Sequence, residues 1–141
     1  MIPPLLSYMS PQQASTALGH EPWASTDGDE TPARGECPSL NSLSATRNPW
    51  SHEGEEGELE LIFVNDRLMR TLFYPGNPEA YLRALRRSGL DLHSYDEDRD
   101  LKIQPRTTVW AFRLADGDRP YVSWMDQALS DEEGRWIARC S

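Results

Sequence analysis

Closely spaced carboxylates are the residues of this chain best suited to acid–base or metal chemistry. Asp116 and Asp118 flank Gly117, and one of three histidines would complete a hydrolytic or metal-dependent site with them. Paired carboxylates act as acid and base only where a pocket shifts their pKa values, and Asp-Gly-Asp is also typical of an exposed turn. We therefore favour a turn and keep a small hydrolase or metal-dependent enzyme as the alternative function.

A second acidic run has the spacing of the first ligands of a calcium-binding loop. Asp96, Asp98 and Asp100 occupy alternate positions. The sixth position of such a loop is Leu101 where glycine is needed, and the twelfth is Thr107 where glutamate is needed. The run therefore favours a solvated acidic turn.

The histidines and cysteines do not form a recognisable site. His20, His52 and His93 are far apart and make no zinc-binding motif. Cys37 and Cys140 permit one disulfide, but without a recognisable secretory signal we expect two unpaired thiols and leave their pairing open. No phosphate loop, dinucleotide fingerprint or nucleophile elbow occurs. The sequence thus predicts no catalytic, cofactor-binding or metal-binding residue.

Aromatic residues outside the obvious core stripes are the candidates for partner contact. They are Trp23, Trp50, Tyr121 and Trp124. Large aromatic side chains often dominate the energy of protein interfaces, but they also close a hydrophobic core from outside. Both roles stay open for all four.

The charge of the chain limits the class of partner. The net charge is −9 over 141 residues, with acidic residues spread along the chain. A nucleic-acid partner needs a basic face, so we expect none, and a basic protein partner or plain solubility explains the acidity. No segment has the apolar length of a membrane span, and the first residues lack the features of a signal peptide. We expect a soluble, cytoplasmic protein.

Cap and turn residues position these candidates on a few elements. Ser10 and Pro11 predict a helix over residues 10–18, and Asn77 caps a second helix over residues 78–88. Between them lies a hairpin over residues 59–74 that turns at Asn65-Asp66. The remaining prediction is a long irregular loop over about residues 20–57 with one short strand at 40–43, and further strands at 90–95, 107–114 and 120–124.

The C-terminal part is predicted to be helical. Ser130 and Glu133 match a capping box that opens a last helix carrying Trp136 and Ile137. Before it, residues 115–119 read as a hairpin loop.

These elements predict one α+β domain over residues 1–141. Strand pairs without regular strand–helix–strand alternation favour an antiparallel sheet of four to five strands with helices on one face. The expected core comprises Leu61, Phe63, Leu68, Leu72, Leu82, Leu85, Val109, Ala111, Val122 and Ile137.

The first half of the chain resembles a known family. Tyr8-Met9-Ser10 begins the first helix, Leu18-Gly19 ends it, Pro22 follows, and the hairpin reads Phe63-Val64-Asn65-Asp66-Arg67-Leu68. This order, over about residues 8–74, resembles the small outer-membrane-assembly lipoproteins of the SmpA/OmlA type and the related β-lactamase-inhibitor-protein-like fold. The resemblance implies a sheet face and loops presented to protein partners, and it implies no catalytic residues. The chain departs from those lipoproteins in having no lipobox cysteine, so we do not carry over an outer-membrane location.

Together these observations predict a non-catalytic protein–protein interaction module of the inhibitor, immunity or assembly-factor type. We expect its acidic surface to attract a basic partner.

Overall fold

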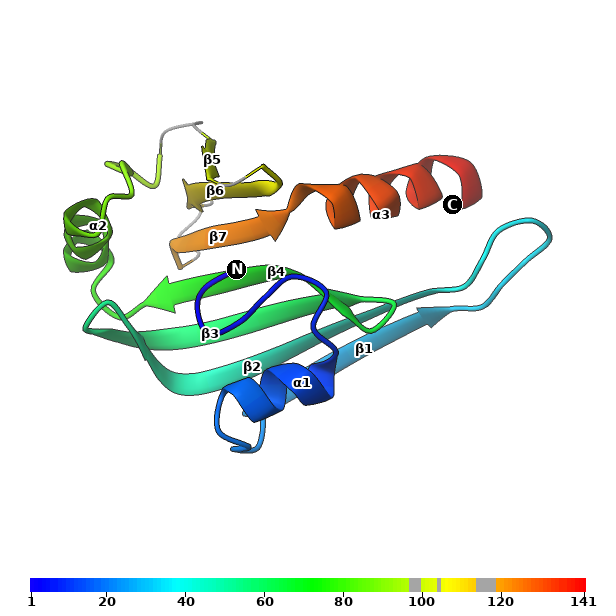
Figure 1. The fold of residues 1–141 in the computed structure, drawn as a ribbon, viewed down its shortest axis with the longest axis horizontal. Helices are drawn as coiled ribbons and strands as arrows, with labels where there is room; N and C mark the ends of the chain where they lie inside the picture. The colour runs from blue at the N-terminus through cyan, green and yellow to red at the C-terminus, as the bar shows by residue number, and fades with distance from the viewer. Residues whose placement is uncertain (97–99, 104, 114–118) are drawn as a thin grey trace.

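Seven antiparallel strands form one sheet in the computed structural model, which describes residues 1–96, 100–103, 105–113 and 119–141 (Figure 1). The order across the sheet is β1-β2-β3-β4-β7-β6-β5. The strands are β1 (Ser25–Thr31), β2 (Leu40–His52), β3 (Glu55–Val64), β4 (Arg67–Pro75), β5 (Leu101–Ile103), β6 (Thr107–Phe112) and β7 (Tyr121–Asp126). The α+β class and the antiparallel sheet are as predicted, but the sheet has seven strands where four to five were expected.

Two of the three helices in the described part of the chain begin at the predicted cap residues. In α1 (Pro11–Ala17), the Ser10 hydroxyl accepts a hydrogen bond from Gln13 N at 3.1 Å, and the Gln13 side chain accepts one from Ser10 N at 2.9 Å. In α2 (Pro78–Arg87), the Asn77 side chain accepts a hydrogen bond from Ala80 N at 3.1 Å. Satisfying these otherwise unpaired amides fixes where each helix starts.

The third helix begins earlier than predicted. α3 spans Gln127–Cys140, and its cap is Asp126, whose carboxylate accepts a hydrogen bond from Leu129 N at 3.0 Å. The capping box at Ser130 was therefore wrong. Asp126 is the last residue of β7, so the chain passes directly from strand to helix and the cap is already in place before Ser130 is reached.

The hairpin between β3 and β4 turns at Asn65 and Asp66, as predicted. Both residues adopt positive φ values, 49° and 61°. Such a two-residue turn matches the twist of the paired strands, and Asn and Asp tolerate the left-handed backbone it needs.

The prediction of an irregular loop over residues 20–57 was wrong. This stretch contains β1, all of the thirteen-residue β2 and the first residues of β3. All seven residues of β1 are exposed, so the strand lacks the apolar alternation by which a half-buried strand is recognised. In the second half of the chain, two predictions differ from the structure. β5 was not predicted, and the strand predicted at residues 90–95 does not form. Asp98 and residues 114–118, which include Asp116 and Asp118, lie outside the described residues.

The main core lies on one face of the sheet, against the N-terminal segment, α1 and α2. Ile2, Leu5 and Ala14 contribute from the N-terminal side, and Tyr81 contributes from α2. Figure 1 shows α1 and the chain before it lying across the strands. Nine of the ten predicted core residues are buried: Leu61, Phe63, Leu68, Leu72, Leu82, Leu85, Val109, Ala111 and Val122. The tenth, Ile137, is 49% exposed because α3 packs on the sheet through Leu129, and Ile137 lies about two turns farther along the helix.

The two cysteines form a disulfide, which corrects the expectation of free thiols. Cys37, in the β1–β2 loop, and Cys140, at the end of α3, have Cα atoms 5.9 Å apart and are bonded. The long β1–β2 hairpin carries Cys37 to the far end of α3, a proximity that the sequence separation of 103 residues conceals. Beside this disulfide, Trp136 Nε1 also donates a hydrogen bond to Pro38 O at 2.7 Å.

Among the described residues, no helix combines the length and apolar character that crossing a membrane requires.

Candidate interaction face

The strands leave a second face of the sheet opposite the core, which we call the outer face. Side chains alternate between the two faces of a strand, so the registers of the strands define it. One row runs from Ser44 through Ile62 and Arg70 to Met125. The outer face comprises these residues together with Glu58, Glu60, Leu72, Tyr74, Thr108, Trp110, Phe112, Tyr121 and Ser123.

Arg70 is fixed at the centre of this face. Its Nε donates a hydrogen bond to Ser123 Oγ at 2.7 Å, and the Ser123 side chain is fully buried. The guanidinium carbon lies 4.8 Å from the centroid of the Trp110 ring and 5.8 Å from that of Tyr121. A cation close to aromatic rings is stabilised by their electron-rich faces. Arg70 is thus held in one place by three contacts, and it forms no ion pair with any described residue.

Further aromatic rings continue the array from Tyr121. The Tyr74 and Tyr121 ring centroids are 5.5 Å apart, and those of Phe112 and Tyr121 are 5.8 Å apart. The Arg119 guanidinium carbon lies 4.4 Å from the Tyr74 centroid, and Arg119 Nη1 pairs with Glu58 Oε2 at 2.5 Å. These rings therefore contact one another or an arginine. Phe112, at the edge of this group of aromatic side chains, remains exposed.

Glu60 links the array to β2. One carboxylate oxygen accepts a hydrogen bond from Ser44 Oγ at 2.6 Å, and the other accepts one from the Tyr74 hydroxyl at 2.9 Å. Burial, followed by the charge and hydrogen bond of Glu60, raises the pKa of Tyr74 well above its ordinary value. Tyr74 thus stays a protonated donor at all physiological pH values, and its ring orientation is fixed.

The array has the composition and rigidity of an interface hot spot. Tyr, Trp and Arg are the residues most enriched at such positions, and side chains already held in place lose less entropy on binding. We define the outer-face array as Arg70, Tyr74, Trp110, Phe112, Arg119 and Tyr121. Of the described helices, α3 packs on this side of the sheet through Leu129, against Val64 and Met69 near the β3–β4 turn. The prediction that the helices lie on one face of the sheet was therefore wrong, because α1 and α2 cover the core face and α3 the other.

The structure separates the four aromatic residues that the sequence singled out. Tyr121 lies in the outer-face array. Trp50 and Trp124 lie on the core side, and both contact His52, with ring centroids 6.1 Å and 5.7 Å from it. Trp124 is only 5% exposed, so it serves the core. Trp23 is half-buried beside Arg47, whose guanidinium carbon lies 5.1 Å from its ring centroid.

Arg70 and Trp110 were missed by the sequence analysis, although a signal for Trp110 existed. The alternation in residues 107–114 places Trp110 with Thr108 and Phe112, on the side opposite Val109 and Ala111. The partnership with Arg70 depends on β4 and β6 both neighbouring β7, which local patterns do not reveal.

His52 has the most perturbed histidine environment of the described residues. Its Nδ1 lies 2.7 Å from the Tyr81 hydroxyl oxygen, and burial lowers its pKa, an effect that the Glu53 charge partly offsets. Its ring contacts among the described residues are with the aromatic side chains of Trp50, Phe73, Tyr81 and Trp124. Within the described ranges, no three His, Cys, Asp or Glu side chains converge to hold a metal ion. His52 therefore acts as part of the packing.

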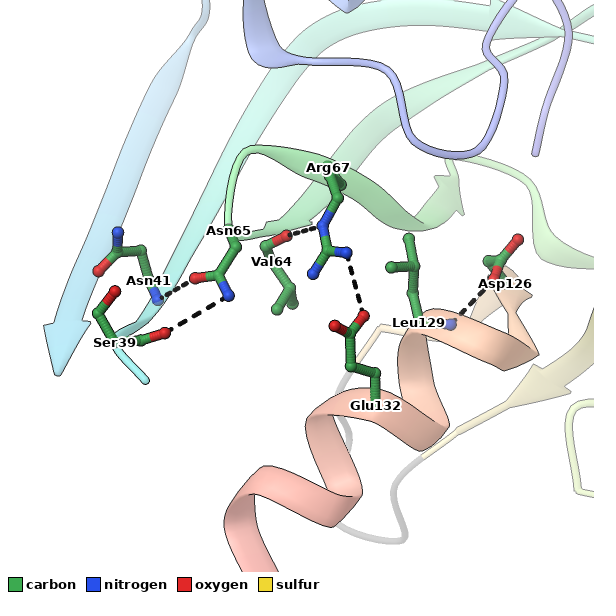
Figure 2. A network of polar contacts seen from close by, with 8 residues as sticks. All are labelled: Ser39, Asn41, Val64, Asn65, Arg67, Asp126, Leu129 and Glu132. Carbon is green, nitrogen blue, oxygen red and sulfur yellow. Dashed lines mark hydrogen bonds and ion pairs between the residues drawn. The ribbon is translucent and has the colours of Figure 1, made fainter. Parts of the chain in front are cut away.

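A small cleft lies between α3 and the β3–β4 turn (Figure 2). It encloses about 220 Å³ and is lined in part by Leu40, Val64 and Trp136. Figure 2 shows Arg67 reaching across it to Glu132, with 3.1 Å between Arg67 Nη1 and the carboxylate.

The polar groups around this cleft brace the structure. The Asn65 side chain accepts a hydrogen bond from Asn41 N at 2.8 Å and donates one to Ser39 O at 3.5 Å (Figure 2). Together with the disulfide, these contacts attach the β1–β2 hairpin and α3 to the β3–β4 turn. These contacts hold the fold together, and the outer-face array, with its Tyr, Trp and Arg side chains, is the better candidate for function.

Comparison with known proteins gives no relative: no family model, no curated protein and no solved structure matches the chain.

Proposed function

We propose that this chain is a non-catalytic protein–protein interaction module that binds its partner through the outer face of the sheet. The observation that carries this proposal is the outer-face array. Arg70 is held by Ser123, Trp110 and Tyr121 on a face that α1 and α2 leave free. The proposal covers inhibitor, immunity and assembly-factor proteins, since each of these types acts by binding another protein.

The array suits a protein surface better than a small molecule. Its rings and guanidinium groups lie side by side across β4, β7 and β6, and the strand registers spread them over one face. Small ligands are usually bound in concave pockets that enclose most of their surface, whereas protein partners cover such faces. The resemblance over residues 8–74 implies the same use of a sheet face, and it stays a prediction.

The charge of the chain supports a partner with a basic surface. With a net charge of −9, the protein attracts a basic partner over long range, which raises the association rate more than the final affinity. The association rate should therefore fall steeply with added salt, while the dissociation rate changes little.

Photo-crosslinking from the outer face tests this proposal. A photoreactive phenylalanine analogue at Phe112, which is 39% exposed on the outer face, should crosslink one protein in native cells. The same analogue at Leu6, which is 65% exposed on the N-terminal segment covering the other face, is the control. A specific product from position 112 that the Tyr121→Ala variant loses supports the proposal. A product from position 6 alone, or no product at either position, contradicts it.

The cellular location stays a proposal as well. Disulfides persist in oxidising compartments and are rare in the cytosol, so the Cys37–Cys140 bond favours an oxidising compartment over the cytoplasmic location predicted from the sequence. Alkylation of rapidly quenched cells decides between them: both thiols should be blocked in an oxidising compartment and both should react in the cytoplasm.

The alternative of a small hydrolase or metal-dependent enzyme keeps its sequence basis in Asp116 and Asp118. Both lie outside the described residues. Stoichiometric metal in the purified protein would favour this alternative.

A further inference from the structure

The strand β1 forms one edge of the sheet, and among the described residues only β2 pairs with it. It pairs with β2 over seven residues, Ser25–Thr31, without a register shift, and every residue in it is exposed. Figure 1 shows it as the last strand on its side of the sheet. An edge strand presents a row of unpaired backbone N–H and C=O groups, which is the template used when a partner adds a strand. The opposite edge strand, β5, spans only three residues.

The edge is held in place at both ends. Before β1, Ala24 N donates a hydrogen bond to Thr46 O at 2.8 Å, and the hydroxyls of Ser25 and Thr46 are 2.6 Å apart. After it, the backbone bridge between Arg34 and Cys37 closes the loop, and Cys37 is bonded to α3. A pre-ordered strand loses little entropy when another strand pairs with it.

Three carboxylates determine which strand can pair there. By alternation, Asp27 and Asp29 project to the outer face, and Glu30 projects to the core side. Their side chains form no hydrogen bond or ion pair with any described residue. Opposite charges across a strand pair stabilise it, so an incoming strand with basic side chains is the complementary one.

The same carboxylates disfavour a second copy of this chain as the occupant. Antiparallel pairing of two β1 edges centred on Gly28 would place Asp27 of one copy opposite Asp29 of the other, twice. Like charges directly opposite destabilise a strand pair, and two copies with a net charge of −9 repel each other at long range.

We propose that the free edge of β1 binds an extended, lysine- or arginine-bearing segment of a partner protein, which adds to the sheet as an eighth strand. The inference rests on the proposed function only in taking the partner to be a protein. It concerns the edge and not the outer-face array, so the two sites can be tested separately.

The test uses a short, fluorescently labelled peptide of alternating valine and lysine, with capped ends, titrated into the full chain. Binding should raise the anisotropy of the peptide and slow amide hydrogen exchange in β1. A peptide of the same sequence with N-methylated backbone amides should not bind, because it cannot form the strand ladder. Binding of both peptides with equal affinity would overturn the proposal, since it would show charge attraction alone.

Two double variants with the same change in net charge complete the test. Asp27→Asn with Asp29→Asn should weaken peptide binding about fivefold, the sum of two exposed ion pairs. Glu55→Gln with Glu56→Gln, on the β2–β3 hairpin, is the matched control and should change binding by much less. Three results would each overturn the proposal. They are equal effects of the two double variants, no peptide binding at millimolar peptide, and dimerisation of the free protein through β1. A failure here would leave the Phe112 crosslink, and hence the proposed function, unaffected.

Discussion

Arg70 Nε and Ser123 Oγ are joined by a 2.7 Å hydrogen bond across β4 and β7, although the two residues are 53 positions apart in the chain. This contact fixes the guanidinium beside Trp110 and Tyr121 and so links the sheet topology to the proposed binding surface. It is available because β7 returns to pair with β4, which brings the C-terminal strands beside the N-terminal hairpins.

Replacing Arg70 by lysine tests whether geometry, and not charge alone, holds the array. Lysine keeps the positive charge but loses the Nε bond to Ser123 and the planar contact with the rings. The free energy of unfolding should fall by about 1–2 kcal/mol, the sum of one partly buried hydrogen bond and a cation–π contact. Urea denaturation measures this. Arg83→Lys, on the exposed face of α2, is the control and should change the free energy by less than about 0.5 kcal/mol; an equal effect would contradict the account.

Removing the disulfide tests its role in tethering α3. The double variant Cys37→Ser, Cys140→Ser should lower the free energy of unfolding by about 2–5 kcal/mol, because a cross-link over roughly 100 residues restricts the unfolded chain. Denaturant titration of this variant and of the reduced wild type should give the same midpoint. If the double variant had the same denaturation midpoint as the oxidised wild type, the Cys37–Cys140 disulfide would not have the stabilising role assigned to it.

The start of α3 can be tested by paired alanine substitutions. Asp126→Ala removes the side chain that caps Leu129 N and should cost about 1–2 kcal/mol of unfolding free energy. Ser130→Ala lies within the helix and should cost less than about 0.5 kcal/mol, since alanine is the better helix former. Thermal denaturation of both variants measures the two losses of stability. A larger loss for Ser130→Ala than for Asp126→Ala would show that the helix cap is at Ser130.

The stability of the protein should depend on pH through His52. Burial lowers the pKa of His52 in the folded state. Below the ordinary His pKa of about 6.5, the imidazole is therefore protonated more readily in the unfolded chain than in the folded protein, which favours unfolding. Its contribution is fully present above about pH 6.5 and is lost as the pH falls toward the folded-state pKa. Urea titrations between pH 7.5 and pH 5 should show this decline, and His52→Gln should flatten it.

The matched control for this pH dependence is His20→Asn. His20 is exposed and has a positive φ of 63°, a backbone conformation that asparagine tolerates. Its pH profile should follow that of the wild type. If His20→Asn removed the decline and His52→Gln did not, the assignment to His52 would be wrong.

Local signals in the sequence predicted the elements whose limits are set by nearby residues. The caps at Ser10 and Asn77 and the turn at Asn65-Asp66 depend on contacts within a few positions, and all three are confirmed. β1 was missed because both of its faces are exposed, so it carries no apolar period. The disulfide could not be predicted because loop closure over 103 residues depends on the whole topology.

The candidate site could be predicted only in part for the same reason. Tyr121 was selected because it lies outside a core stripe, and it does lie in the outer-face array. Trp124 met the same criterion but is buried, since it alternates with Tyr121 and Ser123 along β7 and faces the core. Arg70 gave no signal, because its aromatic neighbours come from strands that follow it by some forty to fifty positions.

The most direct test of the outer face as a binding surface is the affinity of the crosslinked partner, once purified, for two tyrosine variants. Tyr121→Ala removes the ring that contacts Tyr74, Phe112 and Arg70. Tyr8→Ala makes the same change on the segment covering the opposite face, where Tyr8 is 39% exposed. Isothermal titration should show about a thirtyfold loss for Tyr121→Ala, equivalent to about 2 kcal/mol at an interface hot spot, and about twofold or less for Tyr8→Ala. Wild-type affinity in Tyr121→Ala, or a larger loss in Tyr8→Ala, would contradict the account.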